Sequence, residues 1–329
     1  MFMMRFDMRA PANGAPTTEL YQAALEICAW AEMRGAMSAG VCEHHRSADG
    51  YLPAPLTLAT AMAARTIKLP IGVAIVQLPL YNPVRLAEEM CVLDIISGGR
   101  VRYVGGLGYV PEEYEMHGVD FRRRGAIAEE NLALLLRAKT GEPFVHEGRR
   151  IHVTPAPVTP GGPSFGWGGG SLPAARRAGR YGLDFLAQRG DPALRVAYEE
   201  ACREHGHTPG MCFLPQHDAA AVIFVAEDVD RAWDELGPYI MNDVLGYAAW
   251  NEGNNDTHSI SFAKTAEALR AENRSHRILS VDEAIAWVRS GAPLPLHPII
   301  GGLPPKIAWR YLETVVNKVV PAIAGGPAV

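Results

Sequence analysis

The chain has 329 residues, of which 48% are hydrophobic and 20% are charged, so it can bury a large core. The formal net charge is -5 and charges of both signs are interspersed, which argues against a basic nucleic-acid-binding surface. No stretch approaches the roughly 20 apolar residues of a membrane span, and residues 1–10 lack a signal-peptide core. We therefore expect a cytoplasmic protein whose scattered cysteines, with no CxxC pair, stay reduced.

Strand-like and helix-like segments alternate from the start of the chain. A strand is expected at residues 4–8 and a helix at 19–34, and a β-prone run at 37–42 leads to Glu43-His44-His45. Adjacent histidines at the carboxyl end of a parallel strand lie where α/β proteins place their chemistry. Because histidine transfers protons near neutral pH, this patch is the first candidate site.

Continuously apolar runs predict strands buried on both faces, and the amphipathic segments between them predict helices. The next elements in chain order are helix 56–64, strand 69–78, helix 84–96, strand 100–104 and helix 124–139. The remainder are strand 164–167, helix 173–181, strand 183–187, helix 191–205, strand 220–226, helix 228–243, helix 281–289, strand 294–300 and helix 304–320.

Two stretches interrupt this alternation. Residues 140–162 are rich in proline, glycine and charge and are expected to hold one small hairpin, and residues 247–276 form a second excursion and a candidate lid. Elsewhere about eight strands alternate with about eight helices without a break in composition. This pattern favours a (β/α)8 TIM barrel over an open sheet, as a single domain over residues 1–329.

Two glycine-rich loops follow predicted strands. Gly105-Gly106-Leu107-Gly108 lacks the GxGxxG spacing of a dinucleotide site, so it is either a tight turn or a place where the backbone contacts a ligand. Residues 166–171 lead directly into a helix. Glycine N–H groups, the Ser171 hydroxyl and a helix amino terminus together form a phosphate cradle, although a glycine hinge would have the same sequence.

The remaining candidate residues give weaker signals. The other histidines show no metal-ligand spacing, so no metal site is predicted, but His297 near the end of the last strand is a candidate for the barrel mouth. Tyr109 and Trp167 are candidates for the pocket wall. The absence of GxSxG, P-loop and HExxH motifs argues against the common hydrolase, nucleotidase and metalloprotease classes.

Taken together, these motifs resemble the bacterial-luciferase-like flavin-dependent monooxygenases and oxidoreductases. The resemblance is densest in Asn82-Pro83-Val84-Arg85-Leu86-Ala87-Glu88-Glu89 and in residues 93–100, and weakest in residues 247–276. It also covers residues 43–45, 69–79, 105–108, Arg124, 168–171 and 301–305.

The resemblance implies a (β/α)8 barrel with an insertion and a flavin or deazaflavin at the carboxyl ends of the strands. The catalytic histidine would be His44. Apart from the resemblance, the positions of His45, Tyr109, Trp167 and His297 in the sequence make them candidates for the substrate pocket. A bulge with a non-prolyl cis peptide would lie behind the flavin ring near Ala74-Ile75. The cofactor would contact Gly105 and Gly106, and its phosphate would bind to Gly169, Gly170 and Ser171, with Arg124 as charge partner.

Three residues depart from the luciferase pattern. Asn82 stands where a histidine is common, Leu107 replaces an arginine, and Gly170 replaces a glutamate beside the phosphate serine. These changes remove charged side chains from the part of the cofactor site that would bind the phosphate. They leave open whether the cofactor is FMN or the deazaflavin coenzyme F-420.

The leading interpretation is a two-component monooxygenase. Reduced FMN from a separate flavin reductase would react with O2 to give a C4a-peroxide that oxidises a small-molecule substrate. One alternative is hydride transfer with coenzyme F-420, and a second is a non-catalytic flavin-binding subunit, against which the presence of His44 argues. The resemblance also implies a homodimer formed through helices 56–64 and 83–96.

Overall fold

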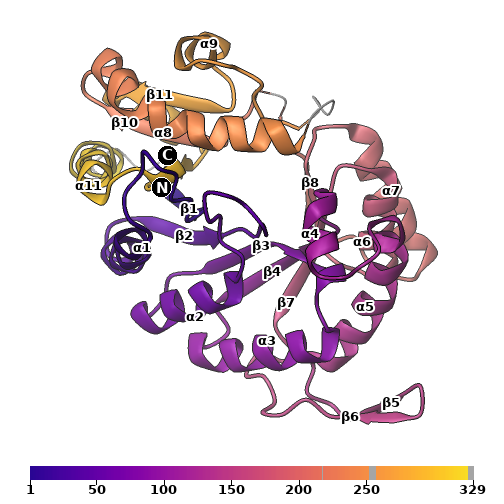
Figure 1. The fold of residues 1–329 in the computed structure, drawn as a ribbon. Coiled ribbons are helices and arrows are strands. Elements are labelled where there is room, and N and C mark those ends of the chain that lie inside the picture. Colours follow the sequence, from indigo (N-terminus) through magenta and orange to yellow (C-terminus); the bar gives the residue numbers. More distant parts are fainter. Residues whose placement is uncertain (217, 252–256, 325–329) are drawn as a thin grey trace. The chain divides into compact units, whose positions relative to one another are not determined.

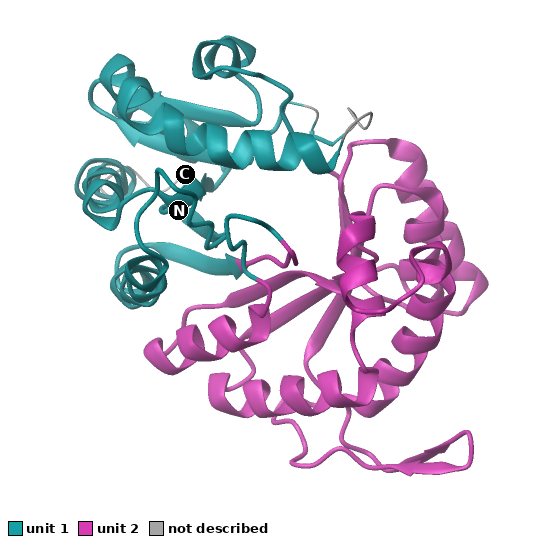
Figure 2. Ribbon diagram, viewed as in Figure 1, with its two compact units in different colours: residues 1–40, 47–52, 216–329 teal, residues 41–46, 53–215 magenta. Residues whose placement is uncertain are grey.

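The computed structural model describes residues 1–216, 218–251 and 257–324, which fold into two compact units (Figure 2). Unit 1 consists of Met1–Gly40, Ser47–Leu52 and Gln216–Val329. Unit 2 consists of Val41–Arg46 and Pro53–Pro215. The chain passes between the units several times, so neither unit is one continuous segment. The expected single domain over residues 1–329 stays a prediction.

A parallel sheet forms the interior of unit 2 (Figure 1). Its backbone ladders confirm the parallel pairing that the alternating pattern predicted, because every adjacent pair of strands in this sheet runs in the same direction. In sheet order, its strands are β3 (Ile71–Gln77), β4 (Val101–Gly106), β7 (Ser164–Gly169), β8 (Phe185–Ala187) and β9 (Cys212–Phe213).

Helices connect these strands, and their ends follow local sequence signals. The Asn82 side chain accepts hydrogen bonds from the backbone N–H groups of Val84 and Arg85 and so begins α3, which Gly98 ends in the left-handed conformation at φ 63°. The helices of unit 2 are α2 (Pro55–Arg65), α3 (Pro83–Ser97), α4 (Pro111–Met116), α5 (Arg124–Ala138), α6 (Leu172–Arg180) and α7 (Pro192–Glu204), with 3-10 turns at Leu78–Leu80 and Phe121–Arg123.

Unit 1 contains two sets of paired strands. β1 (Phe2–Phe6) lies between β12 (Leu294–Leu296) and β2 (Ala36–Val41), and β10 (Val222–Ala226) pairs in parallel with β11 (His276–Ser280). Its helices are α1 (Thr17–Glu32), α8 (Val229–Trp250), α9 (Ala266–Glu272), α10 (Val281–Arg289), α11 (Pro305–Thr314) and α12 (Val320–Ala324), with a 3-10 turn at Ile300–Gly302 and a π-helical segment at Val315–Val319.

The two expected excursions differ in outcome. The small hairpin in residues 140–162 is present as β5 (Phe144–His146) and β6 (Arg149–Ile151). The second excursion is more regular than expected, because α8 continues to Trp250 and α9 lies at Ala266–Glu272. Residues 252–256 of that excursion lie outside the described residues. Its proposed role as a lid stays a prediction.

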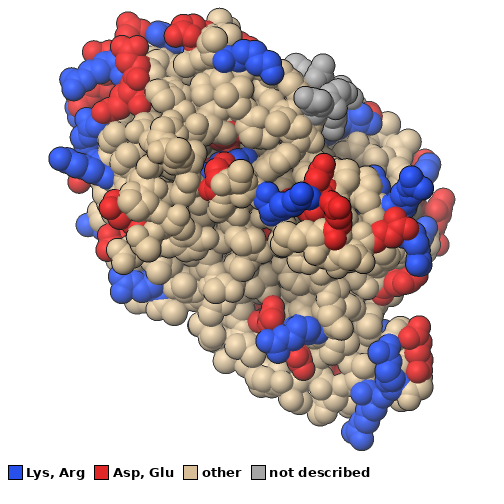
Figure 3. All heavy atoms as spheres, viewed as in Figure 1, with Lys and Arg blue, Asp and Glu red and all other residues tan. Residues whose placement is uncertain are grey.

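The surface agrees with the interspersed charges of the sequence. On the face of the described residues drawn in Figure 3, acidic and basic side chains alternate and neither sign dominates. Among the helices of the described residues, none is both long and apolar enough to cross a membrane. Cys28, Cys91 and Cys202 are buried, and burial raises the pKa of the Cys28 thiol to about 12.

Candidate functional site

The Glu43-His44-His45 segment is anchored at the carboxyl end of β3. The Glu43 carboxylate accepts hydrogen bonds from the backbone N–H of Gln77, at 2.9 Å, and from the hydroxyl of Tyr81, at 2.9 Å. Gln77 is the last residue of β3, so this pairing fixes the segment where the strand ends. All three side chains of the segment are buried, and His44 is only 6% exposed.

His44 lies between a carboxylate and a phenol. Its Nδ1 is 2.8 Å from Oε1 of Glu113 on α4, and its Nε2 is 3.3 Å from the hydroxyl of Tyr109. Burial alone would raise the pKa of Glu113, but its hydrogen bond to His44 and the charge of that ring outweigh burial and lower the pKa. Glu113 is therefore a carboxylate at neutral pH. It accepts the Nδ1 proton of His44, and in the neutral imidazole Nε2 then accepts from Tyr109.

His45 has different partners from those of its neighbour. Its ring Nε2 lies 2.8 Å from Oε1 of Glu43, while its backbone N–H donates to Glu113 at 2.9 Å. The His45 ring also packs edge-on against the ring of His117, with 4.6 Å between ring centres. Burial and the nearby His45 both lower the pKa of His117. The two adjacent imidazole rings thus have separate carboxylate partners, although both residues contact Glu113.

The bulge expected in the third strand is present. The peptide bond between Ala74 and Ile75 is cis, and the ladder between β3 and β4 shifts register there. The Ile75 side chain fills the space above two glycines of the neighbouring strands, since a Cβ would lie 2.5 Å from it on Gly106 and 2.6 Å on Gly168. These glycines therefore allow a close approach of β3 to β4 and β7.

The second glycine loop leads directly into α6, and the phosphate cradle expected there stays a prediction. The Ser171 hydroxyl accepts from the backbone N–H of Ala174 at 3.3 Å and begins α6. Gly169 has φ 155°, and a Cβ there would lie 2.7 Å from the Cβ of Ala174. The exposed Ser171 and the half-buried Gly169 and Gly170 leave this helix amino terminus open to an anion.

The arginines near this loop are held by other groups. The guanidinium of Arg124 lies 3.9 Å from the centre of the Phe121 ring and donates to the Phe121 carbonyl. Arg177 pairs with Glu129 on α5 at 3.0 Å and is nearly buried. Trp167, the candidate for the pocket wall, is fully buried within β7. A phosphate cradle at this loop would therefore rely on backbone groups more than on charge.

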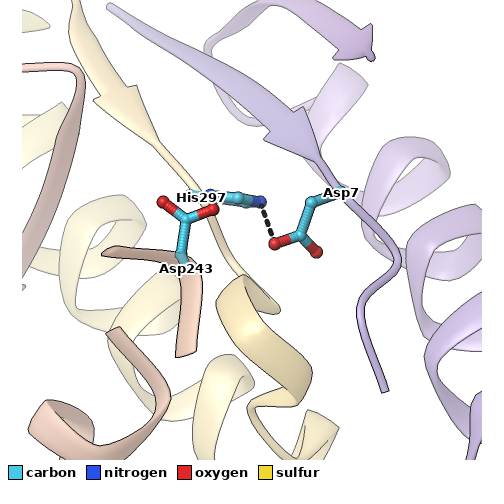
Figure 4. Close-up of side chains that lie close together, drawn as sticks. All are labelled: Asp7, Asp243 and His297. Atoms are coloured by element: carbon cyan, nitrogen blue, oxygen red, sulfur yellow. Dashed lines mark ion pairs between the residues drawn. The ribbon is translucent and has the colours of Figure 1, made fainter. Parts of the chain in front are cut away.

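His297 belongs to a buried cluster in unit 1. Its Nε2 lies 3.5 Å from Oδ2 of Asp7, and Asp243 is the third member of the group (Figure 4). Three such side chains can hold a metal ion. Here, however, both carboxylates also face the guanidinium of Arg9, at 3.8 Å each, and Arg5 lies 3.8 Å from Asp243. Their charge is already compensated, which makes the cluster an ion-pair network.

Sequence reasoning missed Glu113, Gln77 and Tyr81. Glu113 stands 69 residues from His44 in the chain and in a helix of 6 residues, too short to show a periodic pattern. The only available signal was Pro111, which is typical of a first helical position. The residues that position His44 could therefore not be found from the local sequence.

Comparison with known proteins decides the family. A sequence profile described as luciferase-like monooxygenase matches residues 3–292. The chain belongs to the luciferase-like monooxygenase family. This confirms the resemblance seen in the sequence and the expectation that the protein is an oxidoreductase.

The curated relatives of this luciferase-like chain include both a monooxygenase and a dehydrogenase. 4-Hydroxyprotoasukamycin monooxygenase of Streptomyces nodosus is 28% identical over 295 residues, covering 80% of this chain and 75% of that protein. F420-dependent glucose-6-phosphate dehydrogenase 1 of Rhodococcus jostii is 25% identical, covering 98% and 99%. The chain spans only 38% of another relative, the uncharacterized protein y4vJ of Sinorhizobium fredii, at 31% identity.

Solved structures of luciferase-like proteins share the fold. Monooxygenase RslO1 from Streptomyces bottropensis has a TM-score of 0.77 at 19% identity, covering 98% of this chain and 99% of that one. The oxygenating constituent of 3,6-diketocamphane monooxygenase from Pseudomonas putida, in complex with FMN, has a TM-score of 0.70 at 21% identity, covering 98% of each. The C4a-peroxide route and the roles of the site residues stay predictions.

Proposed function

We propose that this luciferase-like chain is a flavin-dependent monooxygenase that uses reduced FMN and O2 to oxygenate a small organic substrate. The observation that carries the proposal is the buried His44, which Glu113 holds near the carboxyl end of β3, the strand that contains the cis peptide. In our proposal the strands close as a (β/α)8 barrel in a single domain, with residues 140–162 and 247–276 as its excursions.

The glycine loops support a flat cofactor with a phosphate. Gly105 and Gly106 carry no side chain that would compete for space, and the phosphate would bind to Gly169, Gly170 and Ser171 at the start of α6. Reduced flavin would supply the electrons that activate O2, and a separate reductase would supply the reduced flavin. Arg124 would contribute charge only after leaving the ring of Phe121.

In this proposal, side chains of the protein would transfer protons and line the substrate pocket. His44 would act as general acid or base, because Glu113 orients the ring and stabilises its protonated form. His45 and Tyr109 would border the substrate. Trp167 and His297 are fully buried, and we propose that they support the pocket wall from inside. The proposed reaction of O2 with the substrate would use the reduced flavin and would not require a metal ion.

A deazaflavin-dependent oxidoreductase is the second candidate. It is favoured by the full-length similarity to an F420-dependent dehydrogenase and by the uncharged residues at the phosphate end, Leu107 and Gly170. In that case the same His44 would exchange a proton with the substrate while a hydride moves between substrate and cofactor. O2 would take no part.

Titration of the purified protein with FMN, reduced FMN and coenzyme F-420 distinguishes the two candidates. We expect the reduced FMN to bind, and to observe O2-dependent oxidation of substrates. Tight binding of coenzyme F-420 with no binding of either form of FMN would reject the monooxygenase proposal and support hydride transfer. Full turnover by His44→Ala would instead favour a non-catalytic flavin-binding subunit.

We also propose a homodimer formed through α2 and α3. The outer face of α3 exposes Val92, Ile95 and Ile96 at 40–44%. An exposed apolar stripe of this kind suits a partner surface. Analytical ultracentrifugation of the protein with Ile95→Glu and Ile96→Glu checks this proposal, because charged residues on the stripe should give a monomer.

A further inference from the structure

Glu113, His44 and Tyr109 form a chain of hydrogen bonds, and Tyr109 is its most accessible member. Glu113 is fully buried and His44 is 6% exposed, whereas Tyr109, the third group in the chain, is half-buried. The phenol of Tyr109 is 3.3 Å from Nε2 of His44, and the two rings meet edge-on at 73° with 5.5 Å between their centres. Of the three groups in this hydrogen-bonded chain, Tyr109 is therefore the most accessible to solvent.

The loop geometry holds Tyr109 in this position. Gly108, the preceding residue, has φ 72°, and a Cβ there would collide with the side chain of Gln77. Only glycine adopts this conformation at so little cost, so the loop turns sharply after β4. The next residues, Val110 and Pro111, lead into α4, which carries Glu113. One short segment thus places both the first and the last group of the chain around His44.

We infer that Tyr109 is a catalytic residue and that His44 exchanges protons with the substrate through the Tyr109 phenol. This inference rests on the proposed function. It also defines a substrate class, since the substrate must carry a proton to release: an alcohol, a phenol or an enolisable carbonyl compound.

In the direction of proton removal, Tyr109 passes a proton from the substrate to His44. The substrate O–H or C–H bond breaks, and its proton goes to the phenolic oxygen of Tyr109. At the same time the original hydroxyl proton of Tyr109 moves to Nε2 of His44. The products are the substrate anion, an intact Tyr109 and a His44 imidazolium, which the Glu113 carboxylate stabilises at 2.8 Å. Reversal of these steps returns a proton to the substrate.

The test uses Tyr109→Phe, which keeps the ring and removes only the hydroxyl. The matched control is Tyr103→Phe on β4, because the Tyr103 hydroxyl is buried and has no hydrogen-bond partner among the described residues. The first measurement is the ¹⁵N NMR spectrum of the histidine rings in the protein without cofactor. We expect the Nε2 resonance of His44 to move in Tyr109→Phe and to stay in place in Tyr103→Phe.

The second measurement uses 4-nitrophenol as a probe, because its absorption distinguishes the phenol from the phenolate. We expect the wild type and Tyr103→Phe to raise the phenolate-to-phenol ratio of the bound probe by about tenfold over free solution, and Tyr109→Phe to abolish this rise. Should Tyr109→Phe be unfolded by circular dichroism, Tyr109→Gln is measured in its place.

Two results would overturn the relay. One is an unchanged His44 Nε2 resonance in Tyr109→Phe. The other is a phenolate ratio that survives in that variant, because His44 would then act directly and Tyr109 would only cover it. Failure of the proposed function is distinguishable from both, since it appears as a wild type that binds none of the flavin or deazaflavin cofactors while the probe still ionises.

Discussion

At the scale of single residues, neighbours in sequence have separate roles. His44 and His45 are adjacent in the chain, but their rings reach different carboxylates. Glu113 holds the ring of His44, whereas Glu43 holds the ring of His45 and ties the segment to β3. A proton on one ring therefore has its own counter-ion and does not need to be shared with the other.

The orientation of His44 depends on the charge of Glu113. In Glu113→Gln a neutral amide replaces the carboxylate, so the charge-assisted hydrogen bond to His44 is lost and an imidazolium is no longer stabilised. We expect turnover to fall by about 100-fold while cofactor affinity changes little. Steady-state kinetics together with a flavin titration measure the two effects separately.

Glu115→Gln is the matched control for this change. Glu115 lies on the same helix, but its side chain is 77% exposed and pairs with Arg46 at the surface. Its replacement should leave turnover within about twofold of the wild type, because exposed ion pairs contribute little. Equal losses in both variants would mean that α4 as a whole, and not the Glu113 carboxylate, supports activity.

These residues show what the sequence can and cannot reveal about a site. The position of His44 after β2 was predictable, because a β-prone run and a polar patch are adjacent in the chain. The Glu113–His44 contact joins residues 69 positions apart, and only the folded chain brings them together. The cis peptide at Ala74–Ile75 was expected from family resemblance alone, since no local property of the two residues indicates it.

At the scale of elements, helix starts were more predictable than short strands. Asn82 begins α3, and a serine begins α6, each through contacts within three residues. By contrast, β11 was missed because its sequence, His-Arg-Ile-Leu-Ser, gains its apolar contacts from β10 some 50 residues earlier in the chain. The π-helical segment Val315–Val319 likewise continues an apolar helical pattern and gives no separate sequence signal.

The start of α6 offers a test of the phosphate cradle. Ser171→Ala removes the cap and the hydroxyl, and we expect it to lower the free energy of unfolding by about 1 kcal/mol. It should also weaken the binding of FMN more than that of riboflavin, because only FMN carries a phosphate. Calorimetric titration with the two flavins measures the difference.

Ser280→Ala provides the control for the loss of a helix cap. Ser280 begins α10 in unit 1, where its hydroxyl accepts from the N–H of Glu283 at 3.3 Å and Glu283 bonds back to it. This variant should lose a similar amount of stability and keep the difference between FMN and riboflavin. If both variants lose the difference in affinity between FMN and riboflavin, or if neither variant loses it, the result counts against a phosphate at Ser171.

At the scale of the whole molecule, the interspersed surface charge contrasts with concentrated charge inside unit 1. Arg9 is 1% exposed and lies 4.7 Å from the Trp250 ring and 4.8 Å from the Tyr51 ring, while it pairs with three aspartates. Burial opposes the charge of Arg9, but Asp243, Asp7 and Asp49 outweigh it and raise its pKa. This network holds β1, α8 and the end of β12 together.

The network should make the protein sensitive to acid. Burial lowers the pKa of His297 below its ordinary value of 6.5. Burial would raise the pKa of Asp243, but the His276 hydrogen bond and the Arg5 charge outweigh it and hold the pKa well below 3.8. Because both pKa values are lower in the folded chain, the unfolded chain binds more protons as the pH falls below the ordinary pKa of each group. Stability is therefore greatest above pH 6.5, falls through His297 below that value, and falls further through Asp243 below pH 3.8.

His297→Asn isolates the histidine contribution. Asparagine does not titrate, so we expect the free energy of unfolding in urea to decline less steeply between about pH 6.5 and about pH 5 than in the wild type, by up to about 1.4 kcal/mol per pH unit. His152→Asn, at an exposed position, should leave the slope unchanged. If the slope of His297→Asn equals that of the wild type, another group carries the acid sensitivity. The buried histidine would then be protonated as easily in the folded chain as in the unfolded one.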